Sequence, residues 1–308
     1  MVVYRELSSI EKDLGYPAKT LYGLSNNLEM HYHSVYIPKS DGDRRKLSVP
    51  DLILKNVQRA IADNILAYYP ISKYATAYKF GASVQRNAVP HVNKKKILKL
   101  DIEKFFDSIL YSRVKNTVFR EEKFSEPIRI LLTMLCYFKE SLPQGAPTSP
   151  AITNIIMYDF DEKVGAYCTE KGIAYTRYCD DMTFSGDFDE KEVIVLVKKE
   201  LRGLGLFLKA SKTKVITSEK RQAVTGIVVN EKINLTKEYK KKLRQEMYYI
   251  EKFGLESHLK NRGITDSFGY LLSLRGRISF VLQTCPQDPE FMRYKKLLQN
   301  IKNPNRFR

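Results

Sequence analysis

The sequence lacks the features that mark several large classes of protein. Its 4 cysteines include no Cys-x-x-Cys pair and its 4 histidines complete no zinc-binding spacing, so we expect neither a disulfide framework nor a structural zinc site. The N-terminus has no apolar core of the kind found in signal peptides, and no later run approaches the length of a membrane span. With 15 glycines, 12 prolines and no low-complexity segment, the chain is also unlike a disordered protein. These absences predict a folded, cytoplasmic protein.

The chain has, in contrast, a large excess of basic residues. Its 308 residues include 52 Lys and Arg against 35 Asp and Glu, which gives a formal net charge of +17. A balance this far from neutral favours a polyanionic partner, and nucleic acid more than an anionic membrane surface. With 43% hydrophobic residues, the chain can still form a core shared by two or three domains.

Apolar periodicity and turn residues predict a mixed α+β chain. Residues 31–50 favour a β-hairpin with an exposed Asp-Gly-Asp turn at 41–43. Apolar residues three and four apart predict a helix over 51–69, with Asp51 as its N-cap. The order of elements over 97–215 predicts an antiparallel sheet backed by helices, the split β-α-β plan. The elements expected after residue 96 are a strand from 97, helices over 126–138, 149–172 and from 190, and hairpins over 173–186 and 221–235.

From residue 236 onward the sequence predicts basic helices. Apolar residues recur at helical spacing at Tyr239, Leu243, Met247 and Ile250. The remaining faces of this helix carry Lys240, Lys241, Lys242 and Arg244. An isolated basic run would suit a solvated helix face, but the excess of base across the whole chain favours a surface for nucleic acid.

Two adjacent carboxylates, Asp180 and Asp181, occupy the tip of the hairpin predicted over 173–186. Two such charges repel by roughly 4 kcal/mol at about 4 Å and the effective dielectric near a protein surface, so something must offset them. Aspartate is common in hairpin turns, and the pair alone would suit that structural role. In a split β-α-β sheet, the strand that ends at Asp101 can lie beside this hairpin. Three converging carboxylates would suit magnesium, which takes oxygen ligands and keeps positions open for phosphate.

Six segments of the chain together resemble reverse transcriptases. "LKLDIEKFFDSI" (98–109) is similar to their first catalytic palm segment, "LPQGAPTSP" (142–150) to their template- and nucleotide-positioning segment, and "YCDD" (178–181) to their aromatic-x-Asp-Asp hairpin. "GLFLKASKTKVI" (205–216) resembles the glycine-lysine segment that follows, "VTGIVV" (224–229) the primer-grip hairpin, and "RRKLSVPDLILKNVQRAI" (44–61) the fingers. The resemblance implies a right-hand polymerase fold, with N-terminal helices and fingers over 1–96, a palm over 97–230 and a helical, basic thumb over 231–308.

The resemblance also implies a two-metal catalytic site. Asp101, Asp180 and Asp181 would bind two Mg²⁺ ions, with the backbone carbonyl of Ile102 as a further ligand. The reaction would be attack of a 3′-hydroxyl on the α-phosphate of a deoxynucleoside triphosphate, with release of pyrophosphate.

A lysine would assist the leaving pyrophosphate in that reaction. The resemblance favours Lys212, which could protonate or neutralise the leaving group. Lys209 and Lys214 are near enough in the sequence to leave the choice open.

Other matched residues would form the nucleotide site. Phe106 matches the aromatic gate whose ring excludes a 2′-hydroxyl, so deoxynucleotides should be preferred. Gln144 and Gly145 would line the site, the glycine because a side chain would collide with the base or sugar. Arg45 and Lys46 would hold the triphosphate.

Two shorter segments narrow the resemblance to retron reverse transcriptases. "NAVPH" (87–91) is similar to their Asn-Ala-x-x-His element and "VTG" (224–226) to their Val-Thr-Gly element. Cys179 stands where those enzymes usually carry alanine, which is also small. The resemblance assigns His91 an architectural or RNA-contacting role. The full set of residues expected to contact RNA or primer is Asn87, His91, Val224, Thr225, Gly226, Lys240, Lys241 and Lys242.

The retron resemblance implies a specific product. The template would be a cognate structured noncoding RNA, and a guanosine 2′-hydroxyl of that RNA would be the primer. The product would be a branched RNA–DNA molecule, made for antiphage defence together with an effector protein.

Three other classes of protein are alternative explanations for the same residues. A group II intron-type reverse transcriptase would need maturase, DNA-binding or endonuclease segments after the thumb, for which the sequence leaves no room. A palm-derived RNA-binding scaffold without turnover would not require the set Asp101, Asp180, Asp181, Gln144 and Phe106. A metal-dependent nuclease would leave "LPQGAPTSP" unexplained. The sequence therefore favours reverse transcription.

Overall fold

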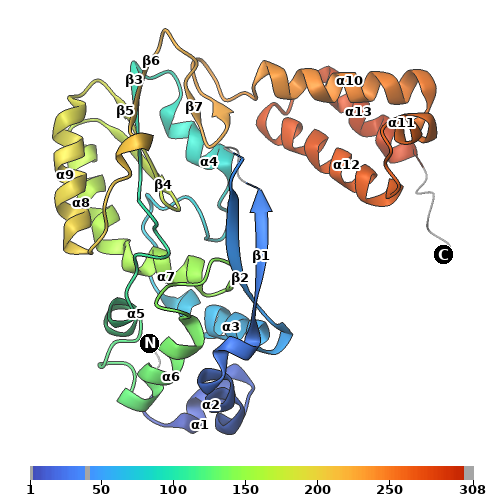
Figure 1. The fold of residues 1–308 in the computed structure, drawn as a ribbon. Coiled ribbons are helices and arrows are strands. Elements are labelled where there is room, and N and C mark those ends of the chain that lie inside the picture. Colours follow the sequence, from blue (N-terminus) through green and yellow to red (C-terminus); the bar gives the residue numbers. More distant parts are fainter. Residues whose placement is uncertain (1–2, 39–41, 302–308) are drawn as a thin grey trace. The chain divides into compact units, whose positions relative to one another are not determined.

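The computed structural model describes residues 3–38 and 42–301, which fall into two compact units (Figure 1). The first unit comprises the chain up to Ala82 together with Lys96–Val215. The second unit combines Ser83–Lys95 with the chain from Ile216 onward. These units cut across the boundaries 1–96, 97–230 and 231–308, which remain predictions.

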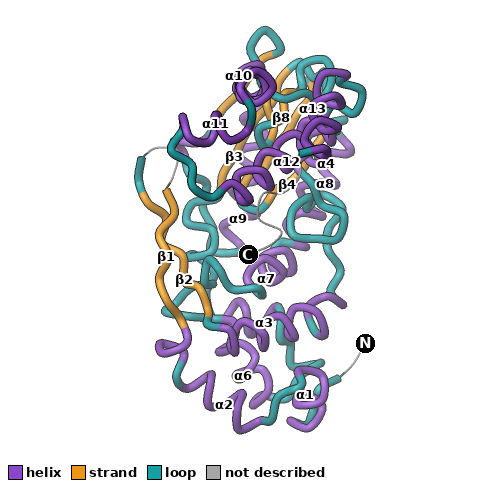
Figure 2. Tube along the Cα trace, turned by 90° about the vertical axis from the view of Figure 1, so that its right-hand side faces the viewer, coloured by secondary structure: helices purple, strands orange, loops and turns teal. Residues whose placement is uncertain are grey.

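The first unit begins with two short helices and a β-hairpin. Helices α1 (Leu7–Leu14) and α2 (Ala18–Asn26) and the 3₁₀ turn η1 (Leu28–His31) precede strands β1 (Tyr32–Pro38) and β2 (Arg44–Pro50). The strands pair antiparallel from Tyr32 opposite Pro50 to Pro38 opposite Arg44, and Figure 2 shows them as a long two-stranded ribbon. The predicted hairpin is thus confirmed, although Asp41 of its expected turn lies outside the described residues.

Helix α3 (Leu52–Asn64) follows the hairpin. The Asp51 carboxylate accepts a hydrogen bond of 2.9 Å from the Leu54 backbone N–H, so the predicted N-cap is confirmed. The helix ends before the expected residue 69 and continues as the 3₁₀ turn η2 (Leu66–Tyr68). Tyr69 is extended, with φ −81° and ψ 142°, because it precedes Pro70 and the residue before a proline is excluded from the helical region.

A four-stranded sheet stands where the split β-α-β plan predicts one. Its strands lie in the order β4 (Ala174–Tyr178), β5 (Asp181–Gly186), β3 (Lys96–Asp101) and β6 (Lys214–Thr217). Strand β5 pairs antiparallel with both β3 and β4, as predicted. Figure 1 shows helices α8 (Tyr158–Glu170) and α9 (Glu190–Gly203) side by side along this sheet.

The prediction of one long helix over 149–172 is wrong. The segment forms two helices, α7 (Ser149–Ile156) and α8, separated at Met157, whose φ of −84° and ψ of 0° depart from helical values. The interruption changes the direction of the chain, and α8 then presents Asp161 to a buried partner on β4. No glycine or proline marks this break in the sequence.

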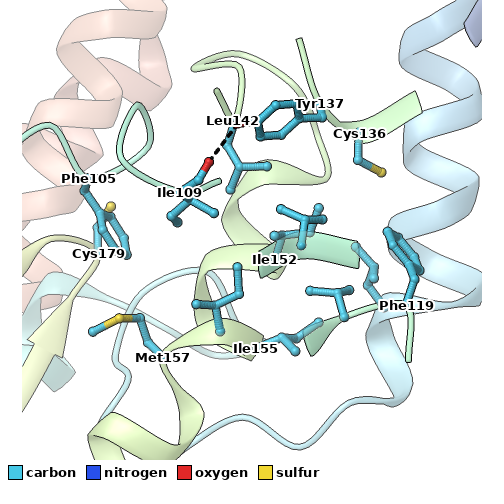
Figure 3. Close-up of a cluster of buried hydrophobic side chains, with 14 of the residues drawn as sticks. Phe105, Ile109, Phe119, Cys136, Tyr137, Leu142, Ile152, Ile155, Met157 and Cys179 are labelled. Atoms are coloured by element: carbon cyan, nitrogen blue, oxygen red, sulfur yellow. Dashed lines mark hydrogen bonds between the residues drawn. The ribbon is translucent and has the colours of Figure 1, made fainter. Parts of the chain in front are cut away.

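The core of the first unit connects the loop after β3 to the helices α5 (Tyr111–Thr117), α6 (Glu126–Cys136) and α7. Figure 3 shows Phe105 and Ile109 of that loop in the same cluster as Ile152 and Ile155 of α7. The Tyr137 hydroxyl donates to the Ile109 carbonyl at 3.1 Å. Burial of each such side chain contributes about 2 kcal/mol, so the segment that follows Asp101 is held firmly.

The second unit contains short strands and a group of helices. The segments α4 (Val84–Ala88) and η3 (Val89–His91) accompany strands β7 (Ala223–Val224) and β8 (Ile227–Val228). Helix α10 (Lys237–Phe253) buries Leu243, Met247 and Ile250, which confirms most of the predicted apolar stripe. Helices α11 (Leu255–Asn261), α12 (Ser267–Thr284) and α13 (Pro289–Asn300) complete the unit. Within the described residues, none of the helices combines the length and apolarity that crossing a membrane requires.

Candidate active site

The sheet brings the three predicted catalytic aspartates to one end. In the antiparallel pair of β3 and β5, Asp101 lies directly opposite Asp181. The Ile102 backbone N–H donates to the Asp180 carbonyl at 3.2 Å, which ties the neighbouring turn to the end of β3. Residues opposite each other in such a pair have Cβ atoms about 5 Å apart. The predicted approach of Asp101 to Asp181 is therefore confirmed, whereas the convergence of all three carboxylates on metal ions stays a prediction.

The turn that carries Asp180 has an unusual backbone. Tyr178 pairs with Asp181, so Cys179 and Asp180 form a two-residue hairpin turn. Cys179 has φ +61°, a left-handed conformation that costs a residue other than glycine about 1–2 kcal/mol. Burial of the Cys179 side chain and hydrogen bonds to its backbone must hold this conformation.

A buried arginine, which was not among the predicted site residues, supports the turn. Arg177 on β4 and Asp161 on α8 are both 0% exposed and form a two-point ion pair, with Nε–Oδ1 at 2.8 Å and Nη2–Oδ2 at 2.6 Å. The Arg177 Nη1 also donates to the Cys179 carbonyl at 2.9 Å. Arg177 thus links helix α8 to the turn that carries Asp180. The signal in the sequence was a charged residue inside the otherwise uncharged strand "IAYTRY".

The ionisation of Asp181 is perturbed by burial and by the neighbouring aspartates. Partial removal of water, followed by the charges of Asp180 and Asp101, raises the pKa of Asp181 to about 6. Lys212 offsets part of this charge, since its Nζ lies 2.5 Å from Asp101 Oδ2. Burial opposes the charged form of Lys212, but the hydrogen bond to Asp101 and the aspartate charges prevail and raise the pKa of Lys212.

The donor chemistry of this end of the sheet fits magnesium. Carboxylate and carbonyl oxygens are the ligands that this hard cation prefers. Over residues 3–38 and 42–301, however, no three His, Cys, Asp or Glu side chains are already arranged around one common ion position. Lys212 is bound to Asp101 in this arrangement. The residues could therefore hold the ions once Lys212 moves from Asp101 toward a phosphate.

The structure distinguishes the three candidate lysines by their contacts. Lys212 reaches Asp101 with its side chain, whereas Lys209 reaches the same residue only through its backbone N–H, 2.8 Å from the Asp101 carbonyl. Lys214 is exposed on β6. Lys212 is thus the lysine that the geometry favours for the leaving group.

Lowering the pH should weaken metal-dependent activity at this site. Because the pKa of Asp181 is raised to about 6, the folded protein takes up a proton there more readily than the unfolded chain does. Without metal, the folded state is therefore favoured as the pH falls through about 6, while the site loses negative charge. We expect the magnesium concentration for half-maximal DNA synthesis to rise as the pH is lowered from about 7.5 to about 5.5. A magnesium requirement that stays constant over that range would contradict this assignment.

Phe106 and the segment 142–150 lie next to each other. The Leu142 backbone N–H donates to the Phe106 carbonyl at 3.2 Å. Phe105 is 3% exposed and belongs to the core, whereas Phe106 is only partly buried. This difference agrees with the prediction of Phe106 as the gate and Phe105 as a core residue.

Changing Phe106 to valine should raise the incorporation of ribonucleotides relative to deoxynucleotides. The ring would act by steric exclusion of a 2′-hydroxyl, so a smaller side chain relaxes the discrimination. The ratio of the two kcat/KM values in a primer-extension assay measures this effect. Phe105→Val provides the comparison, because it should lower stability without changing the ratio; an unchanged ratio in Phe106→Val would remove the gate from this position.

Gly145 has a structural requirement that does not involve a nucleotide. Its φ is +139°, and a Cβ atom there would lie 2.6 Å from the Ser48 carbonyl oxygen on β2. A clash with the base or sugar was the predicted reason for glycine at this position, but the chain itself already excludes a side chain. The close approach also places Gln144, which is partly buried, beside β2.

The predicted triphosphate contacts lie on that same strand. Arg45 and Lys46 are both exposed and pair with Ile37 and Tyr36 across the hairpin. Side chains at consecutive strand positions point to opposite faces. Only one of the two can therefore face a shared triphosphate, which narrows the prediction to a choice between them.

Comparison with known proteins shows the family of the chain. The sequence profile of the family described as reverse transcriptase (RNA-dependent DNA polymerase) matches residues 37–249. The chain belongs to the reverse transcriptase family. Its fold is accordingly the right-hand polymerase fold, with mixed helices and sheet.

The resemblance to retron reverse transcriptases is also confirmed. The retron Ec83 reverse transcriptase of Escherichia coli is 29% identical over 90% of this chain and 90% of its own length. The retron Ec86 enzyme of E. coli is 29% identical over 80% of this chain and 79% of its own length. The retron Mx65 enzyme of Myxococcus xanthus is 31% identical over 71% of this chain, which spans 56% of that relative.

The two segments that resemble retron elements form one structural element of this reverse transcriptase. Thr225 and Gly226, with φ of +45° and +84°, make the two-residue turn between β7 and β8. Asn87 Nδ2 donates to Thr225 Oγ1 at 3.2 Å, which joins "NAVPH" to "VTG". Because Asn87, His91 and Val224 are at most 1% exposed, their packing holds this turn, and among the five predicted contacts in these two segments only Thr225 and Gly226 remain accessible to RNA.

The three lysines of α10 that were predicted to contact RNA differ in their exposure and in their contacts. Lys240, predicted to contact RNA, instead forms an ion pair of 3.1 Å with Asp288, and both side chains are largely buried. Its ammonium group also lies over the Phe291 ring. Lys241 and Lys242 are exposed and remain predicted RNA contacts. Helical periodicity could not show that Lys240 faces α13, since that depends on how the helices pack.

Proposed function

We propose that this chain is an RNA-directed DNA polymerase of the retron type. The observation that carries the proposal is the pairing of Asp101 with Asp181 beside Asp180, in a chain that belongs to the reverse transcriptase family. Asp101, Asp180, Asp181 and the Ile102 carbonyl would hold two magnesium ions. Bound magnesium supplies activation of an attacking hydroxyl and stabilisation of the charge that develops on the leaving pyrophosphate.

The protein's own residues would supply the rest of the chemistry. Lys212, whose side chain is half exposed and whose pKa is raised, would pass from Asp101 to the leaving phosphate and donate a proton there. Phe106 would restrict the sugar, and Gln144 would contact the nucleotide from the partly buried loop next to β2. Arg45 or Lys46 would bind the triphosphate from the exposed hairpin.

The activity is tested by extension of a DNA primer on a homopolymer RNA template. The proposal predicts deoxynucleotide incorporation that depends on magnesium. A protein that binds template and primer but incorporates nothing over a range of magnesium concentrations would be a non-catalytic RNA-binding protein.

We further propose the retron reaction itself for this chain. Similarity to the retron relatives supports a cognate structured noncoding RNA as template, a guanosine 2′-hydroxyl as primer, and a branched RNA–DNA product. The same similarity supports action in the cytoplasm in antiphage defence with an effector protein. The turn formed by Thr225 and Gly226 is where we expect the RNA to be positioned for priming.

Expression with the adjacent noncoding RNA should yield DNA whose 5′ end stays joined to RNA after ribonuclease treatment. A debranching enzyme that cleaves 2′–5′ linkages should release that DNA, as a shift on a denaturing gel. Replacement of the priming guanosine with its 2′-deoxy form in a reconstituted reaction is the control and should prevent synthesis. DNA with a free 5′ end would reject the retron priming while leaving the polymerase proposal intact.

A further inference from the structure

The second unit holds a pocket in which only Lys242 has been assigned a role above. It lies between α10 and α11 and has a volume of about 780 Å³. Pockets of about 300–1,000 Å³ accommodate small ligands or single residues of a larger partner. Its lining combines aromatic, amide and cationic side chains from residues 242–262.

One wall of the pocket is aromatic. Tyr249 and Phe253 lie one helical turn apart on α10, with ring centroids separated by 6.2 Å and planes inclined by 22°. His258 of α11 lies nearly parallel to Tyr249, at 6.3 Å and 20°. Tyr249 and Phe253 remain 42% and 53% exposed, which is unfavourable for large rings unless a partner covers them. Flat rings of this kind stack well on flat ligands.

A fixed polar network forms the floor. Glu246 binds Arg277 at two points, with distances of 2.7 and 2.8 Å, and also accepts a hydrogen bond of 2.9 Å from the Tyr270 hydroxyl. His258 Nε2 lies 2.9 Å from the same hydroxyl oxygen. Since Tyr270 already donates to Glu246, His258 must donate through Nε2. This network holds the His258 ring in place before any ligand binds.

The rim offers hydrogen-bonding groups that the protein does not use. Gln245, Ser257 and Asn261 line the pocket, and their side chains have no hydrogen-bond partner among the residues that the structure describes. Amide groups provide both a donor and an acceptor, so they can bind the edge of a nucleobase. The polar part of the lining therefore suits a ligand with both kinds of group.

The charge of the pocket favours an anion. Lys242 and Arg262 line it, and among the described residues the only acidic one in the lining is Glu246. Arg277 offsets Glu246, and Arg262 also lies 3.6 Å from it. Burial opposes the charged form of Glu246, but these arginines prevail and keep the pKa of Glu246 low, so it stays ionised and compensated. Lys242 remains to bind a phosphate.

We propose that this pocket binds one unpaired nucleotide of an RNA, with its base stacked on Tyr249 and Phe253 and its phosphate next to Lys242. An unpaired nucleotide combines a flat ring, donor and acceptor edges, and a negative charge, and these match the three parts of the lining. A base in a duplex cannot enter, because both of its faces are covered. The inference rests on the proposed function and specifies which form of RNA this unit recognises.

The test uses a single-stranded RNA of about ten nucleotides that contains one 2-aminopurine. Its binding is compared with that of a blunt duplex of the same sequence. Fluorescence anisotropy gives the affinity, and 2-aminopurine emission reports stacking. Tyr249→Ala should weaken single-strand binding by about 10-fold and reduce the change in emission, whereas Tyr249→Phe should retain both. Duplex binding should change little in either variant.

Tyr248→Ala is the matched control, because Tyr248 is 52% exposed on the same helix but does not line the pocket. Lys242→Gln should lower the slope of log affinity against log salt by about 0.7, and Tyr249→Ala should leave that slope unchanged. Equal losses in Tyr248→Ala and Tyr249→Ala, or no loss in either, would overturn the proposal and leave the pocket to a protein partner. Magnesium-dependent synthesis by the unchanged protein is measured separately, so failure of the proposed function would be distinguishable.

Discussion

Changing Asp180 and Asp181 together to asparagine should abolish DNA synthesis while the protein stays folded. The two side chains keep their size but lose the charge that would bind metal, and metal stabilisation of a phosphoryl transition state contributes several kcal/mol. We therefore expect a loss of about 100-fold or more in primer extension. Burial and then the charges of Asp180 and Asp101 raise the pKa of Asp181 and so disfavour its ionised form, and the thermal midpoint without metal should therefore not fall.

The control for this variant is the same change of charge elsewhere in the first unit. Asp63 and Asp159 are both exposed, and neither lies at the end of the sheet. Asp63→Asn combined with Asp159→Asn should leave synthesis close to that of the parent. Substantial synthesis by the Asp180 and Asp181 variant at ordinary magnesium would reject these residues as ligands.

Changing Arg177 to methionine should have the largest effect on stability and should also stop synthesis. The change leaves Asp161 buried without its partner, which costs about 3–5 kcal/mol. It also removes the donor to the Cys179 carbonyl, so the turn that carries Asp180 loses its support. Urea unfolding measures the first effect and primer extension measures the second.

Two further variants distinguish the effect of Arg177 on the position of the Cys179–Asp180 turn from its effect on the stability of the fold. Replacing the pair together, with Asp161→Leu and Arg177→Met, should recover much of the stability, because no charge is left buried alone. Synthesis should stay low, since the Cys179 carbonyl still lacks its donor. Adding Cys179→Gly should then restore part of the synthesis, because glycine adopts φ +61° without strain. Recovery of synthesis in parallel with stability, before glycine is added, would assign Arg177 a purely structural role.

Local patterns in the sequence predicted much of the fold. The Asp51 cap, the hairpin at 31–50 and the strands that carry Asp101 and Asp181 follow from turn residues, capping and alternation, which operate over a few residues. The aspartate cluster could be predicted because a single sheet topology brings those strand ends together. Helix boundaries near Pro70 and Met157 were predicted less well.

The residues that were missed depend on packing between distant segments. Arg177 and Asp161 are an ordinary basic and an ordinary acidic residue in the sequence, and only the register of β4 against α8 makes them a buried pair. Lys240 differs from Lys241 only by the direction in which the helix presents it. The contact between Gly145 and Ser48 likewise needs the loop and the strand together. Patterns read along one segment carry no information about these partners.

The second unit is built from two separate stretches of the chain, and this affects both how it folds during synthesis and how it can be produced as a fragment. Residues 83–95 leave the ribosome well before their partners beyond Ile216 exist, so Asn87 must wait for Thr225 while the first unit is completed. A fragment that begins at Ile216 would lack the segment that supports the Thr225–Gly226 turn. The second unit can be produced alone only if 83–95 is supplied as a separate peptide or joined by a linker to the fragment, as in a circular permutant.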